Sequence, residues 1–180
     1  MGILRPMNKQ NGFSLIEALV TMTIAAIVLS VGIPSFQSFI QNNRQTIAIN
    51  ELATALQLAR STAVTRSQQA TVCKSSNGTD CTTDGTWTQG WIVFADPNNN
   101  NSHDAGEEIL RVHGAIQGDG TLTGNLNVAN LVAFKPQGVL ASLNGTITYC
   151  DSRGHDHASA LVISRGGHIR FENDGSLLTC

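Results

Sequence analysis

The chain has 180 residues and a formal net charge of −2 at pH 7, with 11 Lys and Arg against 13 Asp and Glu. This length predicts one globular domain with appendages, and the slightly acidic balance excludes a protein that attracts nucleic acids through an overall positive charge. Gly, Asn, Ser and Thr are frequent whereas aromatic residues make up 5%, a composition typical of short strands joined by many turns.

An apolar segment near the N-terminus dominates the sequence. Residues 13–33 contain a single charged residue, Glu17. A helix of this length spans about 31 Å, close to the roughly 30 Å hydrocarbon core of a bilayer. A carboxylate inside such a span costs on the order of 3 kcal/mol, so Glu17 needs a partner. A cut between Gly12 and Phe13 would supply one, because the new α-amino group of Phe13 is a cation one helical turn away, or opposite the Glu17 of a neighbouring chain.

The residues from Gly12 to Glu17 read G-F-S-L-I-E and resemble the cleavage and N-methylation motif of type IV pilins and type II secretion pseudopilins. The resemblance implies cleavage after Gly12 by a prepilin peptidase and methylation of the Phe13 amine. It also implies that Glu17 helps to dock the subunit into a helical filament. Pro34 matches as well, because helices of this superfamily carry a proline kink at this point.

The resemblance implies three parts: a cleaved leader at 1–12, a transmembrane and filament-core helix at 13–40, and a periplasmic α+β domain at 41–180. Arg5 and Lys9 of the leader are expected to stay in the cytoplasm, which gives a single pass through the inner membrane until the subunit enters a pilus or pseudopilus. Loss of the leader leaves nine basic and thirteen acidic residues, a charge of −4.

The alternative for the N-terminal segment is an ordinary signal peptide with a cut after Gly32. Two observations oppose it. The apolar run is longer than the usual 7–15 residues of a signal peptide, and it contains Glu17.

One long helix is predicted from 13 to about 68, continuing past Pro34 with a kink. Its second half has one apolar seam at steps of three and four, formed by Ile49, Leu52, Leu56, Ala59 and Ala63. Strands are then predicted at 71–74, 91–94, 108–113, 131–134, 146–150, 160–164 and 168–171. The last two form a hairpin around Arg165-Gly166-Gly167, and residues 75–85, 96–106 and 114–130 are turns. The predicted fold class is therefore α+β, one long N-terminal helix packed on an antiparallel sheet, in agreement with the pilin fold.

Three later segments resemble the GspH/FimT/FimU branch of the pilin superfamily: NELATALQLARSTAVTRSQQATVC (50–73), GWIVFADPNNN (90–100) and EEILRVHG (107–114). This resemblance implies a non-enzymatic minor pilin or pseudopilin at or near the filament tip, with other pilin subunits as partners. It leaves open whether the machine is a type IV pilus or a type II secretion system. We find no nucleophile-and-base arrangement and no phosphate-binding Gly-rich loop, so no enzyme and no cofactor are expected.

Four cysteines lie in the part that would be exported: Cys73, Cys81, Cys150 and Cys180. Four cysteines allow three connectivities. Proximity in the sequence favours Cys73 with Cys81, which leaves Cys150 to pair with Cys180. Metal binding is the alternative, but no C-x-x-C pair is present and the expected compartment is oxidising.

Two polar segments suggest metal binding. In the segment 96–107, oxygen-bearing side chains have the spacing of a calcium loop: Asp96, Asn98, Asn100, Asp104 and Glu107. Against a calcium site, Asn101 replaces the usual Gly and the flanks read as strands, so a polar hairpin loop is the alternative. The second segment, His155-Asp156-His157, lacks a third ligand and is expected to be an exposed turn.

The predicted C-terminal hairpin carries Arg165, His168 and Arg170. In FimT-like minor pilins that take up DNA, a Gly-Arg-x-Arg hairpin motif binds the DNA backbone. Gly167 and Arg170 match this motif, whereas His168 replaces its first arginine. DNA binding in natural transformation is therefore the alternative function, against a solvated hairpin with two arginines near Glu172 and Asp174.

Overall fold

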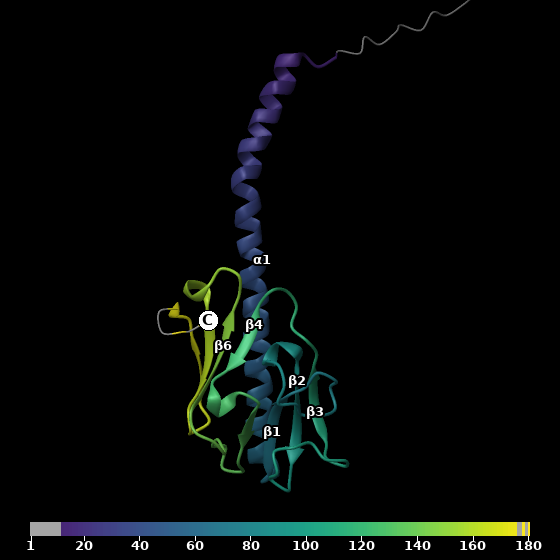
Figure 1. The fold of residues 1–180 in the computed structure, drawn as a ribbon, viewed down its shortest axis with the longest axis vertical. Coiled ribbons are helices and arrows are strands. Elements are labelled where there is room, and N and C mark those ends of the chain that lie inside the picture. Colours follow the sequence, from purple (N-terminus) through teal and green to yellow (C-terminus); the bar gives the residue numbers. More distant parts are fainter. Residues whose placement is uncertain (1–11, 176–177, 179) are drawn as a thin grey trace, which may run out of the picture. The chain divides into compact units, whose positions relative to one another are not determined.

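The computed structural model describes residues 12–175, 178 and 180 (Figure 1). The chain divides into two compact units, one that ends at Ile40 and one that begins at Gln41. Helix α1, Leu15–Arg66, starts in the first unit and ends in the second, with Pro34 inside it. The predicted long helix is therefore present, with ends within two residues of those expected.

Within the described residues, eight strands follow the helix, and they form two four-stranded sheets rather than one. The first sheet has the order β3-β2-β1-β5 and the second β4-β6-β7-β8, with every neighbouring pair antiparallel. The strands are β1 Gln69–Lys74, β2 Trp91–Asp96, β3 Ile109–His113, β4 Thr121–Gly124, β5 Leu131–Phe134, β6 Gly145–Cys150, β7 Ser159–Ile163 and β8 Ile169–Glu172. Three short 3-10 helices complete the elements: η1 Trp87–Gln89, η2 Leu126–Val128 and η3 His155–His157.

Strand β4 corrects the sequence analysis, which assigned residues 114–130 to turns. The strand reads T-L-T-G and offers one large apolar side chain, Leu122, which is fully buried. One apolar residue between threonines is too short an alternation to be recognised from the sequence. Pairing with β6, in which Leu122 lies opposite Tyr149, stabilises the strand.

The core of the second unit lies between α1 and both sheets, which lie beside each other along the C-terminal part of the helix (Figure 1). The predicted seam is buried, with Leu52, Leu56, Ala59 and Ala63 fully inaccessible to solvent. Alanines on the seam have no side chain beyond Cβ, so the helix approaches the strands closely. The seam prediction is confirmed.

The two sheets differ in how they are covered. Every residue of β1 and β2 is buried, because α1 covers one face of the first sheet and a small cluster containing Cys73, Ile92 and Phe94 covers the other. In β6 burial alternates along the strand, as expected for a sheet with one solvated face. The continuous apolar run in β2 thus reflects burial on both sides.

Candidate functional site

The processing and assembly motif lies at the start of α1. Gly12, Phe13 and Ser14 precede the helix, and the Oγ of Ser14 accepts a hydrogen bond from the backbone N–H of Glu17 at 3.3 Å. This geometry is an N-cap, and Ser followed three residues later by Glu is the capping-box pattern. Ser14 therefore sets where the helix begins. The sequence analysis did not single out this residue, although the S-x-x-E pattern was visible.

The segment that carries the motif is open to solvent in the single chain. Every residue from 12 to 39 is exposed, and 84% of Phe13 is accessible. Among the described helices, α1 is the one long and apolar enough to cross a membrane. Apolar surface on this scale marks contact with a membrane or with other subunits. A Cβ atom added at Gly12 would meet no atom within 4 Å, so the fold itself does not require glycine there.

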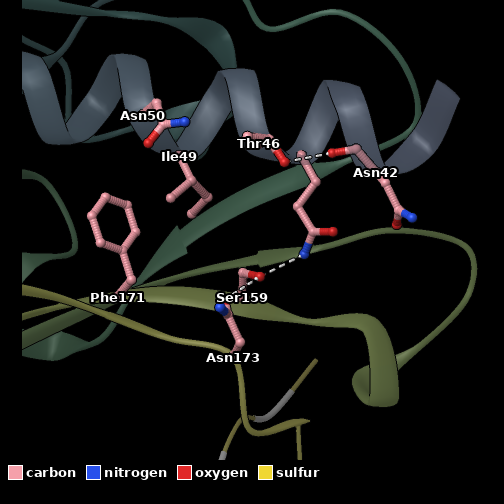
Figure 2. Close-up of a pocket in the computed structure, with 8 residues that line it drawn as sticks. Asn42, Thr46, Ile49, Asn50, Ser159, Phe171 and Asn173 are labelled. Carbon is pink, nitrogen blue, oxygen red and sulfur yellow. Dashed lines mark hydrogen bonds between the residues drawn. The ribbon is translucent and has the colours of Figure 1, made fainter. Parts of the chain in front are cut away.

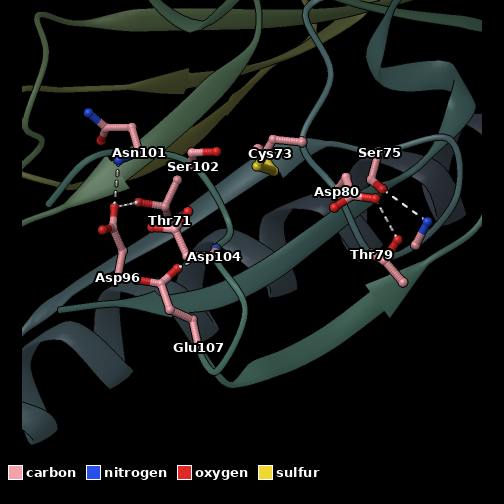
Figure 3. The surroundings of a disulfide bond; sticks show 12 residues. Thr71, Cys73, Ser75, Thr79, Asp80, Asp96, Asn101, Ser102, Asp104 and Glu107 are labelled. Atoms are coloured by element: carbon pink, nitrogen blue, oxygen red, sulfur yellow. Dashed lines mark hydrogen bonds between the residues drawn. A yellow bond between two sulfur atoms is a disulfide. The ribbon is translucent and has the colours of Figure 1, made fainter. Parts of the chain in front are cut away.

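The structure joins the cysteines in the favoured pairs, and the described residues include no free cysteine. Cys73 and Cys81 have Cα atoms 5.6 Å apart, and Cys150 and Cys180 have Cα atoms 5.7 Å apart. Figure 3 shows the surroundings of the Cys73–Cys81 bond. This bond closes the loop after β1 over the outer face of the first sheet, where Cys81 packs against Ile92 and Phe94.

A buried lysine next to this disulfide escaped the sequence analysis. The ammonium group of Lys74 donates hydrogen bonds to the carbonyl oxygens of Thr83 at 3.0 Å and Gly85 at 2.8 Å. Burial lowers the pKa of Lys74 because desolvation disfavours the charged form. The side chain holds residues 83–85 against the end of β1, a contact that no local pattern in the sequence reports.

The proposed calcium loop connects β2 to β3, so its flanks are strands as expected. Its first residue points into the protein. Asp96 is fully buried, and its Oδ2 accepts a hydrogen bond from Gln69 Nε2 at 2.6 Å. The same oxygen accepts from Thr71 Oγ1 at 3.0 Å and from the backbone N–H of Asn101 at 3.1 Å (Figure 3). Its Oδ1 accepts from the backbone N–H of Asn100 at 3.1 Å. Both carboxylate oxygens are thus occupied by donors of the protein.

The remaining loop residues also bond to one another instead of pointing oxygens at a common centre. The amide nitrogens of Asn98 and Asn100 donate to Oδ2 of Asp104 at 2.8 and 2.6 Å, and these bonds lower the pKa of Asp104. Oε2 of Glu107 accepts from the backbone N–H of Asp104, while its Oε1 is buried with no hydrogen-bond partner in the described structure. Over the described residues no group of three His, Cys, Asp or Glu side chains could hold a metal. The side chains therefore do not fit a calcium ion, and calcium binding stays a prediction without geometric support.

The basic side chains of the C-terminal hairpin are brought together by the β7–β8 turn. Arg165, His168 and Arg170 are all exposed, and Nη1 of Arg170 lies 3.5 Å from Oε2 of Glu172. Gly167 in the turn has φ +77°, and a Cβ atom there would lie 2.0 Å from the carbonyl oxygen of Gly138. Glycine is therefore required at this position by both backbone geometry and space.

An arginine of α1, Arg60, holds the same turn in place through hydrogen bonds to backbone carbonyl groups. Nε of Arg60 donates to the carbonyl oxygen of Gly138 at 2.9 Å, and Nη2 donates to that of Gly166 at 3.2 Å.

The His155-Asp156-His157 segment forms the short helix η3 and is exposed, as expected.

Comparison with known proteins identifies the family. Residues 48–167, more than half of the chain, match the family described as type II transport protein GspH. The chain belongs to the GspH family. Residues 7–33 also match the prokaryotic N-terminal methylation motif. The resemblance of the N-terminal segment and that of the later segments are therefore both confirmed.

The fold of this chain is similar to that of two kinds of solved structure. The type IV minor pilin FimU of Pseudomonas aeruginosa superposes with a TM-score of 0.59 at 24% identity, over 74% of this chain and 92% of FimU. The minor pseudopilin EpsH from the type 2 secretion system of Vibrio cholerae gives a TM-score of 0.52 at 11% identity, over 72% of this chain and 96% of EpsH. Fimbrial protein Q of Moraxella bovis is 36% identical over 47 residues, which span 26% of this chain and 30% of that protein. The predicted pilin-like α+β fold is confirmed.

Among the described residues of the GspH-family domain, Asp151 and Arg153 form a nearly buried ion pair that hydrogen-bonds to α1. Oδ2 of Asp151 lies 2.7 Å from Nη2 of Arg153, and the Asp151 side chain is 1% exposed. Nη1 of Arg153 donates to Oδ1 of Asn42 on α1 at 2.6 Å, and Nη2 donates to Oε1 of Gln45 at 3.4 Å. The hydrogen bonds from Arg153 lower the pKa of Asp151, although burial acts in the opposite direction.

We expect this pair to make the domain acid-sensitive. Because the folded-state pKa of Asp151 is lower than the unfolded value of about 3.9, its stabilisation is present above about pH 5 and is lost as the pH falls through the folded-state pKa. At pH 6, Asp151→Asn is expected to melt about 5 °C below the wild type. The difference between the two melting temperatures should shrink as the pH is lowered toward 2.5. Thermal unfolding of the detergent-solubilised chain at both pH values measures this, and an equal difference at both would contradict it. Asp104→Asn is the exposed control.

Proposed function

We propose that this GspH-family chain is made as a precursor with a leader at 1–12 that a prepilin peptidase removes. Before assembly the mature subunit is anchored in the inner membrane, with residues 41–180 in the periplasm. It is then extracted into a filament, at or near the filament tip. The observation that carries this proposal is an exposed carboxylate, Glu17, at the start of an exposed apolar helix. Exposure of such an apolar helix to water is unfavourable, and so is burial of an unpaired carboxylate in lipid.

Cleavage after Gly12 supplies that partner. The new α-amino group belongs to Phe13, which directly precedes the capping residue Ser14. In the subunit, or between subunits, this cation compensates Glu17. Filament assembly is therefore favoured over the isolated state by both burial of the apolar helix and pairing of the charges.

Mass spectrometry of the purified protein tests the processing step. We expect a chain that begins at Phe13 and carries one added methyl group. Gly12→Val should remain unprocessed, because glycine is needed by the peptidase and not by the fold. Gly32→Val, at a second position where a Cβ atom meets nothing within 4 Å, is the control and should be processed normally. A mature chain that begins after Gly32 would instead identify a signal peptide.

We propose DNA binding by the β7–β8 hairpin as the second candidate function. The supporting observation is that Arg165, His168 and Arg170 are all exposed around one turn, which Arg60 holds in place. Guanidinium groups suit phosphate. Pairing of Arg170 with Glu172 weakens this surface, so binding to DNA is expected to be weak and independent of sequence.

The DNA proposal predicts a shallow dependence on salt. Two arginines that neutralise two phosphates give a slope of about 2 for log affinity against log salt on duplex DNA. We expect Arg165→Ala with Arg170→Ala to lose measurable binding at low salt. Arg111→Ala, on β3 of the other sheet, should bind as the wild type. Equal binding by the double variant and the wild type in a fluorescence titration would show that the hairpin does not contact DNA.

A further inference from the structure

A cleft of about 260 Å³ lies between α1 and the β7–β8 edge of the second sheet (Figure 2). Among the described residues no charged side chain lines it, although Arg153 bonds to the side chains of Asn42 and Gln45 beside it. Its polar lining consists of four carboxamides and two hydroxyls: Asn42, Gln45, Asn50, Asn173, Thr46 and Ser159. Its apolar lining consists of Ile49 and the ring of Phe171.

One side of this polar lining is held in a fixed orientation. Nε2 of Gln45 donates to the carbonyl oxygen of His157 at 2.7 Å and to Oγ of Ser159 at 2.8 Å. The hydroxyl of Ser159 in turn donates to Oδ1 of Asn173 at 2.8 Å. These bonds fix the orientation of the Asn173 carboxamide through its oxygen and leave its amide nitrogen free to donate.

Part of the remaining polar lining is committed, since the hydroxyl of Thr46 donates to the carbonyl oxygen of Asn42 and Oδ1 of Asn42 accepts from Arg153, but three groups are not. Within the described residues, the side chain of Asn50 makes no hydrogen bond, and the amide nitrogens of Asn42 and Asn173 make none. A carboxamide offers two donor hydrogens and one acceptor oxygen. The cleft therefore presents both donors and acceptors, without charge, to whatever enters it.

Phe171 is unusual among the aromatic side chains of residues 41–180. The other five are almost fully buried: Trp87, Trp91, Phe94, Phe134 and Tyr149. Phe171 is 50% exposed, although its cross-strand neighbour Leu161 is fully buried in the core. An aromatic face is thus left open beside uncommitted carboxamides (Figure 2).

We propose that this cleft binds a neutral saccharide, with one sugar ring against Phe171 and its hydroxyls on the carboxamides. A sugar hydroxyl both donates and accepts hydrogen bonds, which matches the mixed lining. The apolar C–H face of the sugar packs on the aromatic ring. An ionic ligand is disfavoured because its desolvation needs a counter-charge, and the nearby guanidinium of Arg153 is already paired with Asp151. A few converging polar groups beside an apolar wall are typical of small-ligand sites.

Ligand-observed NMR on the full chain, in a detergent without a sugar headgroup, tests this proposal. The probes are N,N′-diacetylchitobiose, which represents acetamido sugars of cell-wall type, lactose, which represents neutral surface glycans, and sialyllactose, which carries a charge. We expect saturation transfer to at least one neutral probe, and the stronger of the two identifies the source. Sialyllactose should bind no better than lactose.

Two variants assign the binding to the cleft. Phe171→Leu keeps an apolar side chain but removes the ring, and Asn50→Ala removes a carboxamide that makes no bond in the fold. Each is expected to weaken binding roughly fivefold. Gln57→Ala, exposed on the same helix two turns further on, is the control and should leave binding unchanged.

Three results would overturn the saccharide proposal. The first is the absence of saturation transfer to either neutral probe, and the second is binding that both cleft variants retain. The third is efficient disulfide cross-linking of Asn50→Cys to another pilin subunit in assembled filaments, because the cleft would then be covered by protein. The first two results do not depend on where the N-terminus is processed.

Discussion

Replacement of Glu17 by alanine is expected to leave cleavage after Gly12 intact and to remove the subunit from filaments. The carboxylate lies in an exposed apolar helix, and in the assembly we propose its partner is the α-amino group of Phe13. Loss of an interaction on the order of 3 kcal/mol lowers the assembly equilibrium by about a hundredfold. Immunoblotting of sheared filaments against the membrane fraction measures this effect.

The matched control for Glu17 is Thr21→Ala, one helical turn further on. The Thr21 hydroxyl donates to the carbonyl oxygen of Ala18 within its own helix, so its loss should not change assembly. If Glu17→Ala were found in filaments at the wild-type level, the docking role of this carboxylate would be wrong. If the variant were not cleaved, Glu17 would belong to the recognition site of the peptidase instead.

The largest loss of stability in the domain is expected for Asp96→Ala. This change leaves the buried hydroxyl of Thr71 without an acceptor and takes from the buried Gln69 amide one of its two acceptors, the other being Oδ1 of Asn101. It also frees the loop backbone at Asn100 and Asn101. Each buried donor left unsatisfied costs about 1–3 kcal/mol. We expect a total of about 4 kcal/mol, which corresponds to a fall in melting temperature of roughly 10 °C.

Asp104→Ala is the control, because Asp104 accepts two side-chain hydrogen bonds in the same loop but is exposed. A similar loss in both variants would show that Asp96 has no special structural role. The same experiment tests calcium. A rise in melting temperature with millimolar calcium that is abolished in Asp96→Ala would support a cation site, whereas the hydrogen-bond network predicts no rise.

Much of the fold could be predicted from the sequence because its signals are local. The seam from Ile49 to Ala63 repeats at helical spacing, and the strand at β2 is a run of large apolar residues. The Gly12–Glu17 motif is a property of six consecutive residues. The disulfide pairs were partly local as well, since Cys73 and Cys81 are separated by 8 positions.

Other features depend on residues that meet only in the folded chain. Gln69 lies opposite Asp96 in the β1–β2 pair. The first residue of a segment with calcium-loop spacing is therefore a buried acceptor of several hydrogen bonds. The partners of Asp96 on β1 are 27 and 25 positions away. Arg153 reaches Asn42 across 111 positions.

The sequence by itself therefore determined the family, the helix and its seam, and the N-terminal motif, because each is encoded by spacing within a few residues. The tertiary structure alone decided that the strands divide into two sheets, that Asp96 faces inward, and that a neutral cleft opens beside Phe171. The physical reason is that burial and hydrogen-bond satisfaction are set by neighbours in space. Strand pairing and helix packing choose those neighbours, and they bring together residues that no local pattern connects.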